Sequence, residues 1–125
     1  MFHMKRRVIQ AVSDLEVYSL SYSLAMEVFE ISKKFPKEEL YSLTNQIRRS
    51  SRSVPANISE GFAKRFYWNI FRHHLYTAMG SVEETKTWLG FARDSSYISN
   101  DEQEKLKNEY TRIGAMLFRM IQNWH

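Results

Sequence analysis

At 125 residues the chain is long enough for one domain with its own core, and its 4 glycines and 2 prolines are too few for a fold rich in strands and turns. The absence of cysteine excludes a disulfide scaffold and thiolate chemistry. The formal net charge of +4 favours an anionic partner without requiring one.

The N-terminal residues 1–13 show no helical period and include three basic side chains, Lys5, Arg6 and Arg7. We therefore expect a flexible arm there, followed by a single helical domain over residues 14–125. The N-terminus lacks the apolar centre of a signal peptide. No apolar run approaches the roughly 20 residues that span a bilayer. These features predict a cytoplasmic protein with no membrane partner.

The first helix is predicted from Asp14, as its N-cap, to about Lys34, because Pro36 ends the pattern. A helix at the edge of a monomeric bundle needs one apolar row. This helix has two, formed by Leu15, Tyr18, Tyr22, Met26 and Phe29 and by Val17, Leu20, Leu24, Val28 and Ile31. The second row indicates burial against another subunit or, alternatively, a broad core face.

The second helix is predicted to begin at Pro36 or Lys37, to continue through Ile58 and to break at Gly61. Its apolar positions share one side, and three arginines lie opposite. The apolar set is Leu40, Leu43, Ile47, Val54 and Ile58, and the arginines are Arg48, Arg49 and Arg52. One helix is therefore expected to carry both a core face and a cationic face.

A short connection at residues 62–66 places the next helix antiparallel, and that third helix is predicted over residues 67–94. Its core positions alternate steps of 4 and 3, as in a heptad seam. They are Phe71, Leu75, Ala78, Val82, Thr85, Leu89 and Ala92. A second row, again a surplus of apolar or small surface, consists of Phe66, Ile70, Thr77, Ser81, Trp88 and Phe91.

The fourth helix is predicted from a capping box, Ser99 followed by Glu102, to the C-terminus. Its core positions are Leu106, Tyr110, Ile113, Leu117, Ile121 and Trp124. Four amphipathic helices joined by short connections predict an all-α fold, an antiparallel up-down-up-down four-helix bundle.

The strongest charge asymmetry lies between residues 48 and 72, where six basic residues accompany one acid, Glu60, for a net charge of +5. Arginine binds phosphate and stacks on bases, and Tyr67 and Trp68 add aromatic surface. We therefore expect a nucleic-acid interface formed by Arg48, Arg49, Arg52, Lys64, Arg65 and Arg72. The alternatives are a solvated face and pairing with acids such as Glu60.

Other site chemistry finds little support in the sequence. No glutamate precedes a histidine by three residues, and His73 and His74 point about 100° apart on a helix, so we expect no metal site. No phosphate loop or nucleophile elbow occurs, so we expect no cofactor and no enzyme activity. Asn57 and Glu60 have no nucleophile or base beside them and are expected to make interhelical hydrogen bonds.

One catalytic pattern remains as an alternative. Arg119 and His125 are spaced as in the Arg-x(4 to 6)-His signature of the HEPN family of helical ribonucleases. Such a pair could stabilise phosphorane charge and move a proton. Met120 replaces the polar residue that usually follows the arginine, and short spacings of this kind arise by chance.

The segment LTNQIRRSSRSVPANISEGFAKR, residues 43–65, resembles the hallmark of the four-helix-bundle family encoded by intervening sequences in bacterial 23S rRNA genes. DLEVY (14–18), FPKEELYSL (35–43) and GSVEET (80–85) resemble its other blocks, so the resemblance extends from Asp14 to Trp124. The family motif positions it marks are Gln46, Arg48, Arg49, Pro55, Ala56, Asn57, Glu60, Gly61 and Glu83.

RRSSRSV (48–54) and ETKTWLGFARD (84–94) are also similar to one branch of that family, the accessory variability determinants of diversity-generating retroelements. This resemblance implies a homopentameric barrel of bundles that binds nucleic acid and a reverse transcriptase, without known catalysis. The aromatic segment RFYWNIF (65–71) departs from the polar start that the third helix often has in the family.

The basic segment and the resemblance together predict a non-enzymatic scaffold that binds RNA or an RNA/DNA hybrid. The similarity to the retroelement branch implies, in addition, a role as accessory to a reverse transcriptase. A protein-interaction scaffold that binds no nucleic acid is the first alternative. A ribonuclease using Arg119 and His125 is the second.

Overall fold

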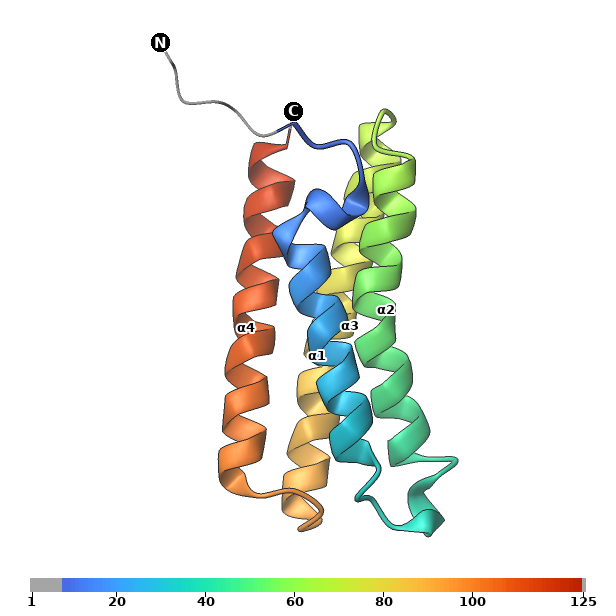
Figure 1. Ribbon diagram of the computed structural model, residues 1–125, viewed down its shortest axis with the longest axis vertical. Coiled ribbons are helices and arrows are strands. Elements are labelled where there is room, and N and C mark those ends of the chain that lie inside the picture. Colours follow the sequence, from blue (N-terminus) through green and yellow to red (C-terminus); the bar gives the residue numbers. More distant parts are fainter. Residues whose placement is uncertain (1–7, 125) are drawn as a thin grey trace.

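The computed structural model describes residues 8–124 and shows a four-helix bundle in which successive helices run antiparallel (Figure 1). The described residues contain no strand. The helices are α1 (Glu16–Ser32), α2 (Leu43–Ala63), α3 (Trp68–Asp94) and α4 (Asn100–Asn123), with short 3-10 helices η1 (Val12–Asp14) and η2 (Lys37–Glu39). Each long helix packs on two others, and α1 contacts α4, so the four helices surround a common core. The predicted all-α bundle is confirmed.

The heptad pattern of α3 is confirmed as a core face, because all seven of its positions are buried. Of the predicted core positions on α4, Leu106, Tyr110, Ile113 and Leu117 are buried. Ile121 and Trp124 are half-buried and pack against the core. The predicted capping box is present, since the Glu102 backbone N–H donates to Ser99 Oγ at 3.0 Å. The strict periods of these two helices made their boundaries accurate to one or two residues.

The predicted start of the second helix was wrong, because α2 begins at Leu43 and not at Pro36 or Lys37. The carboxylate of Glu39 accepts hydrogen bonds from Ser42 Oγ at 2.6 Å and from the Leu43 backbone N–H at 3.3 Å. It therefore caps the new helix from outside. The hydrogen bonds from Ser42, Tyr97 and Leu43 lower the pKa of Glu39. Leu40, assigned to the core by its spacing, precedes α2 and is 46% exposed.

The predicted start of the first helix was also wrong. Asp14 closes the 3-10 helix η1, and its Oδ2 accepts from the backbone N–H groups of Gln10 and Ala11 at 2.9 and 3.0 Å. The α-helix begins at Glu16 and ends at Ser32. Residues 1–7 of the expected arm lie outside the described residues, whereas Ile9 and Val12 pack against the core.

The two apolar rows of α1 differ in burial. Leu24 and Val28 of one row are buried, but Tyr22 and Met26 of the other are 54% and 49% exposed. The single chain therefore leaves part of α1 apolar and exposed to solvent. Within residues 8–124 no helix has both the length and the hydropathy needed to cross a membrane.

Gly61 does not break α2, as the sequence had suggested, because the helix continues to Ala63. The residue is buried where α2 crosses α3. A Cβ at this position would lie 2.6 Å from His74 Cβ and 3.0 Å from Phe71 Cδ1, which is closer than ordinary contact. Glycine is required there because the two helices approach too closely for a side chain.

We predict that Gly61→Ala lowers the free energy of unfolding by about 1–3 kcal/mol, because the new methyl group overpacks the contact between α2 and α3. Gly80→Ala is the matched control: its Cβ meets nothing within 4 Å, and the better helix propensity should raise stability by about 0.5–1 kcal/mol. Urea denaturation of both variants measures the difference. Equal effects of the two substitutions would contradict the assigned role of Gly61.

Candidate nucleic-acid interface

Three of the six predicted basic residues lie together in the first half of α2. They line an open groove of about 370 Å³ between α2 and the segment that precedes it. Its lining residues are Leu40, Tyr41, Thr44, Asn45, Arg48, Arg49 and Arg52, and we call it the arginine groove. Within residues 8–124 no ion pair includes any of the three arginines.

Arg48 is held more firmly than the sequence suggested. The residue is half-buried, and its Nε donates a hydrogen bond of 2.7 Å to Ser32 Oγ at the end of α1. Its guanidinium lies 4.7 Å from the ring centroid of Phe29, also on α1. Arg48 therefore connects α1 to α2 through a cation–π contact and a hydrogen bond. It is not on the face opposite the core, where it had been placed.

Arg49 and Arg52 have more freedom, because both side chains are exposed. The guanidinium of Arg52 lies 5.6 Å from the ring centroid of Phe29, and Arg49 makes no hydrogen bond, ion pair or ring contact within the described part of the chain. A guanidinium group offers five donors and keeps its charge at all ordinary pH values. Two exposed guanidinium groups without acidic partners can bind phosphate oxygens.

Tyr41 belongs to the same groove and was missed by the sequence prediction. The residue is 91% exposed and contributes nothing to the core. The sequence shows Tyr41 only as one aromatic residue just before α2, and it does not belong to the periodic apolar positions that were used to predict the helix. Beside three arginines, its exposed ring could stack on a nucleobase.

The other three predicted residues lie far from the arginine groove. The connection between α2 and α3 is at the opposite end of the bundle from the start of α2 (Figure 1). Lys64 follows Arg52 by twelve positions, which corresponds to about 18 Å along the helix. Lys64 is paired with Glu60 at 3.5 Å. The guanidinium of Arg65 stacks on Phe62 at 4.0 Å.

Arg72 lies one turn inside α3, and its guanidinium donates to Asn69 Oδ1 at 3.4 Å. His74 faces α2, and Arg72 lies two positions before it on the same helix. Two positions correspond to a rotation of about 160°, so the Arg72 side chain points away from α2. The six residues thus form an arginine groove of three and a separate basic cluster of Lys64, Arg65 and Arg72 at the other end.

The motif residue Asn57 makes the interhelical hydrogen bond expected of it. Its Oδ1 lies 3.1 Å from Nδ1 of His74 on α3. Glu60 Oε2 lies 3.9 Å from Nε2 of the same imidazole. No group of three histidine, aspartate or glutamate side chains within residues 8–124 is arranged to hold a metal ion.

The pair proposed for ribonuclease chemistry is described only in part. Arg119 is exposed on α4 and borders a groove of about 430 Å³ that includes Asp14 and Glu16. His125 lies outside the described residues.

Comparisons with known proteins agree with the fold. A family model described as 23S rRNA-intervening sequence protein matches residues 13–119. The chain is also similar to a crystal structure from Bacteroides thetaiotaomicron VPI-5482, described as a protein with unknown function from the S23 ribosomal protein family. The two share 26% sequence identity with a TM-score of 0.77, over 86% of this chain and 99% of that chain. No curated protein matches this chain.

We predict that Arg48→Lys lowers the free energy of unfolding by about 1 kcal/mol, although it conserves the charge. Lysine cannot reproduce the planar stacking on Phe29 together with the bond to Ser32. Arg49→Lys is the control and should leave stability unchanged, because that side chain is exposed. Thermal denaturation compares the two, and equal stability of both variants would refute the structural role of Arg48.

Proposed function

The chain belongs to the family of 23S rRNA-intervening sequence proteins, and we propose that it is a non-enzymatic protein that binds RNA or an RNA/DNA hybrid through its arginine groove. One observation carries the proposal. Arg49 and Arg52 are exposed, and no ion pair in the described part of the chain neutralises them. They lie beside Tyr41, whose ring is almost wholly exposed.

The physical case rests on what such a groove recognises. Phosphate oxygens satisfy several guanidinium donors at once, and binding releases counterions from the nucleic acid. The exposed tyrosine adds a flat surface for an unpaired base. A groove of about 370 Å³ that is open to solvent fits a backbone passing over the surface better than an enclosed small molecule.

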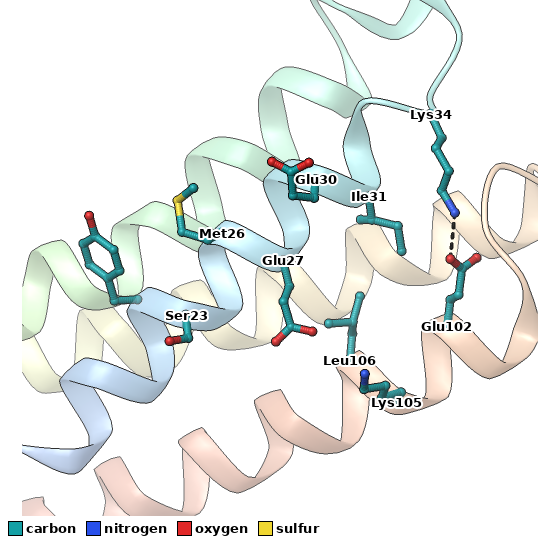
Figure 2. A pocket seen from close by; sticks show the side chains of 10 residues that line it. Ser23, Met26, Glu27, Glu30, Ile31, Lys34, Glu102, Lys105 and Leu106 are labelled. Carbon is teal, nitrogen blue, oxygen red and sulfur yellow. Dashed lines mark hydrogen bonds and ion pairs between the residues drawn. The ribbon is translucent and has the colours of Figure 1, made fainter.

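We also propose that the chain assembles with copies of itself. Tyr22 and Met26 form an exposed apolar ridge on α1 between two grooves. The groove toward α2 measures about 570 Å³ and includes Pro55. The groove toward α4 measures about 700 Å³, and Figure 2 shows Glu27 extending into it from α1. A contiguous apolar ridge of this kind is typical of a surface that another protein covers.

A heterologous contact joins two different surfaces, and contacts of this kind close into a ring when the rotation between copies allows it. The exposed ridge on α1 would then meet another face of the next copy, which leaves Arg49 and Arg52 on α2 available to nucleic acid. The number five comes from the resemblance to the accessory variability determinants, and we propose a homopentameric barrel.

The finer role follows the same resemblance. Residues 48–54 and 84–94 are similar to the retroelement branch, and on that basis we propose a cytoplasmic accessory protein of a reverse transcriptase. Arg49 and Arg52 lie within the first of these segments, so the residues proposed to bind nucleic acid are part of the similarity. An interaction scaffold that uses its arginines on acidic proteins is the competing function.

The nucleic-acid proposal predicts that Arg49→Glu with Arg52→Glu weakens RNA binding at least tenfold. The slope of log affinity against log salt concentration should fall by about 1–2, because about two phosphate contacts are lost. Fluorescence anisotropy with a labelled structured RNA, repeated at several salt concentrations, measures both effects. Arg48 is left intact, so that the variant keeps its fold.

The control for this test is Lys107→Glu with Arg112→Glu on α4, which changes the net charge equally at two exposed sites. It should retain most of the affinity. Equal losses in the two double variants would mean that net charge alone attracts RNA and would contradict a site in the arginine groove. Absence of wild-type binding, with capture of protein partners that survives nuclease treatment, would favour the interaction scaffold.

The assembly proposal predicts that light scattering gives five times the chain mass of 14.9 kDa. Tyr22→Glu with Met26→Glu should yield monomers, because the ridge on α1 would then carry two more charges. Tyr76→Glu with Phe118→Glu alters two similarly exposed side chains on α3 and α4 and should leave the mass unchanged. A monomeric wild-type protein would refute the assembly.

A further inference from the structure

The connection between α2 and α3 presents aromatic rings to solvent. Phe66 is 85% exposed and Tyr67 is 70% exposed, and neither belongs to the core. Basic residues lie on both sides of them, Arg65 before and Arg72 one turn into α3. An exposed aromatic pair within a basic segment is a composition typical of surfaces that bind single-stranded nucleic acid.

These side chains border a pocket of about 480 Å³, lined by Arg65, Phe66, Trp68 and Trp124. We call it the hairpin pocket. Two of its walls are held by the core, because Trp124 and Trp68 pack edge-on against the buried Phe71 with ring centroids 5.0 and 5.8 Å apart. The pocket therefore combines two anchored indole rings with one exposed phenyl ring.

Arg65 gives the pocket a charge that is only partly used. Its guanidinium lies 4.0 Å from the ring centroid of Phe62 and 4.9 Å from that of Phe66. It donates one hydrogen bond, of 3.1 Å, to the carbonyl oxygen of Phe62. No ion pair within residues 8–124 includes Arg65, so its other donors remain for a ligand.

The start of α3 adds to the same positive field. Its N-cap residue, Tyr67, makes no side-chain capping bond, and the helix that follows has 27 residues. The backbone N–H groups of Ile70 and Phe71 donate to the Tyr67 carbonyl oxygen, so the N–H groups of Trp68 and Asn69 are those that the first turn can offer to an anion. Arg72 follows Trp68 by four residues and so lies on the same side of α3 as that pocket wall.

We propose that the hairpin pocket binds one unpaired nucleotide, with its base stacked on Phe66 and its phosphate held by Arg65 and the start of α3. This inference rests on the proposed nucleic-acid binding and specifies its ligand as a strand with at least one unstacked base. A base inside a duplex has both faces covered by its neighbours and cannot stack on a protein ring. The arginine groove, about 18 Å away along α2, binds phosphates of single strands and duplexes alike through Arg49 and Arg52, and a change at Phe66 leaves its Tyr41 ring in place.

The test compares a single-stranded RNA with a blunt duplex of the same length, the single strand carrying 2-aminopurine. Phe66→Leu keeps an apolar side chain but removes the flat ring, and the high exposure of Phe66 means that folding should not suffer. We expect about a tenfold loss of affinity for the single strand, an unchanged affinity for the duplex, and weaker quenching of 2-aminopurine. Phe66→Trp should restore the wild-type behaviour.

Phe91→Leu is the matched control, since Phe91 is an exposed phenylalanine of the same helix bundle, 56% exposed and distant in sequence from the pocket. It should leave both affinities unchanged. Equal affinity of the wild type and Phe66→Leu for the single strand would overturn the pocket while leaving the arginine groove intact. A changed assembly mass in Phe66→Leu, with RNA affinity unchanged, would make Phe66 a subunit contact and would also overturn it.

A binding measurement with a single nucleotide distinguishes failure of this inference from failure of the proposed function. If the wild type binds neither RNA, the proposed function fails, and the pocket can still be examined with 2-aminopurine riboside 5′-monophosphate alone. Quenching by the wild type that Phe66→Leu abolishes would support the pocket. No quenching by the wild type would overturn it.

Discussion

The close packing of α2 on α3 is the contact on which the rest of the structure depends. At one end the missing side chain of Gly61 lets His74 and Phe71 approach the backbone of α2. Further along, Ser53 accepts a hydrogen bond of 2.9 Å from Ser81, and Ser50 accepts one of 2.8 Å from Thr85. Small residues allow the short distance between the helices, and their hydroxyl groups satisfy one another where water is excluded. Because this contact fixes the rotation of α2, it also determines which residues of α2 face solvent.

The family motif on α2 consequently divides into two sets with different physical roles. Asn57 and Gly61 face α3 and hold the bundle together, and Pro55 is buried. Arg49 is exposed, and no hydrogen bond or ion pair within the described residues holds its side chain. Arg48 lies between these sets, since it connects α1 to α2 while its charge remains at the edge of the groove. Membership of the family motif therefore does not by itself indicate that a residue contacts a ligand, because some motif residues face the neighbouring helix.

The sequence could predict the parts of the fold in which one periodic pattern dominates. The buried face of α3 and the capping box of α4 were predicted correctly because each depends on residues close together in the chain. The predicted start of α2 was wrong because the actual start is set by Glu39. That carboxylate accepts hydrogen bonds from the Leu43 backbone N–H and from the hydroxyl of Tyr97, which is distant in the sequence. The basic segment was found from its composition. Its division into the arginine groove and the separate basic cluster follows from the length of α2, which places the two groups at opposite ends of the helix. Tyr41 was missed because a single aromatic residue in a turn has no periodic signal.

The two proposed sites lie toward opposite ends of α2, and their separation bears on how a weakly charged chain could bind nucleic acid. A separation of about 18 Å corresponds to about five nucleotides of a stacked strand at 3.4 Å each. One strand could therefore contact the arginine groove with its phosphates and reach the hairpin pocket with an unstacked base. Each contact involves few charges, and the net charge of the chain is only +4. In the proposed ring the same pair of sites would occur five times, so that each bound segment raises the effective concentration of the next. Assembly would then supply the affinity, and the hairpin pocket would supply the preference for unpaired strands.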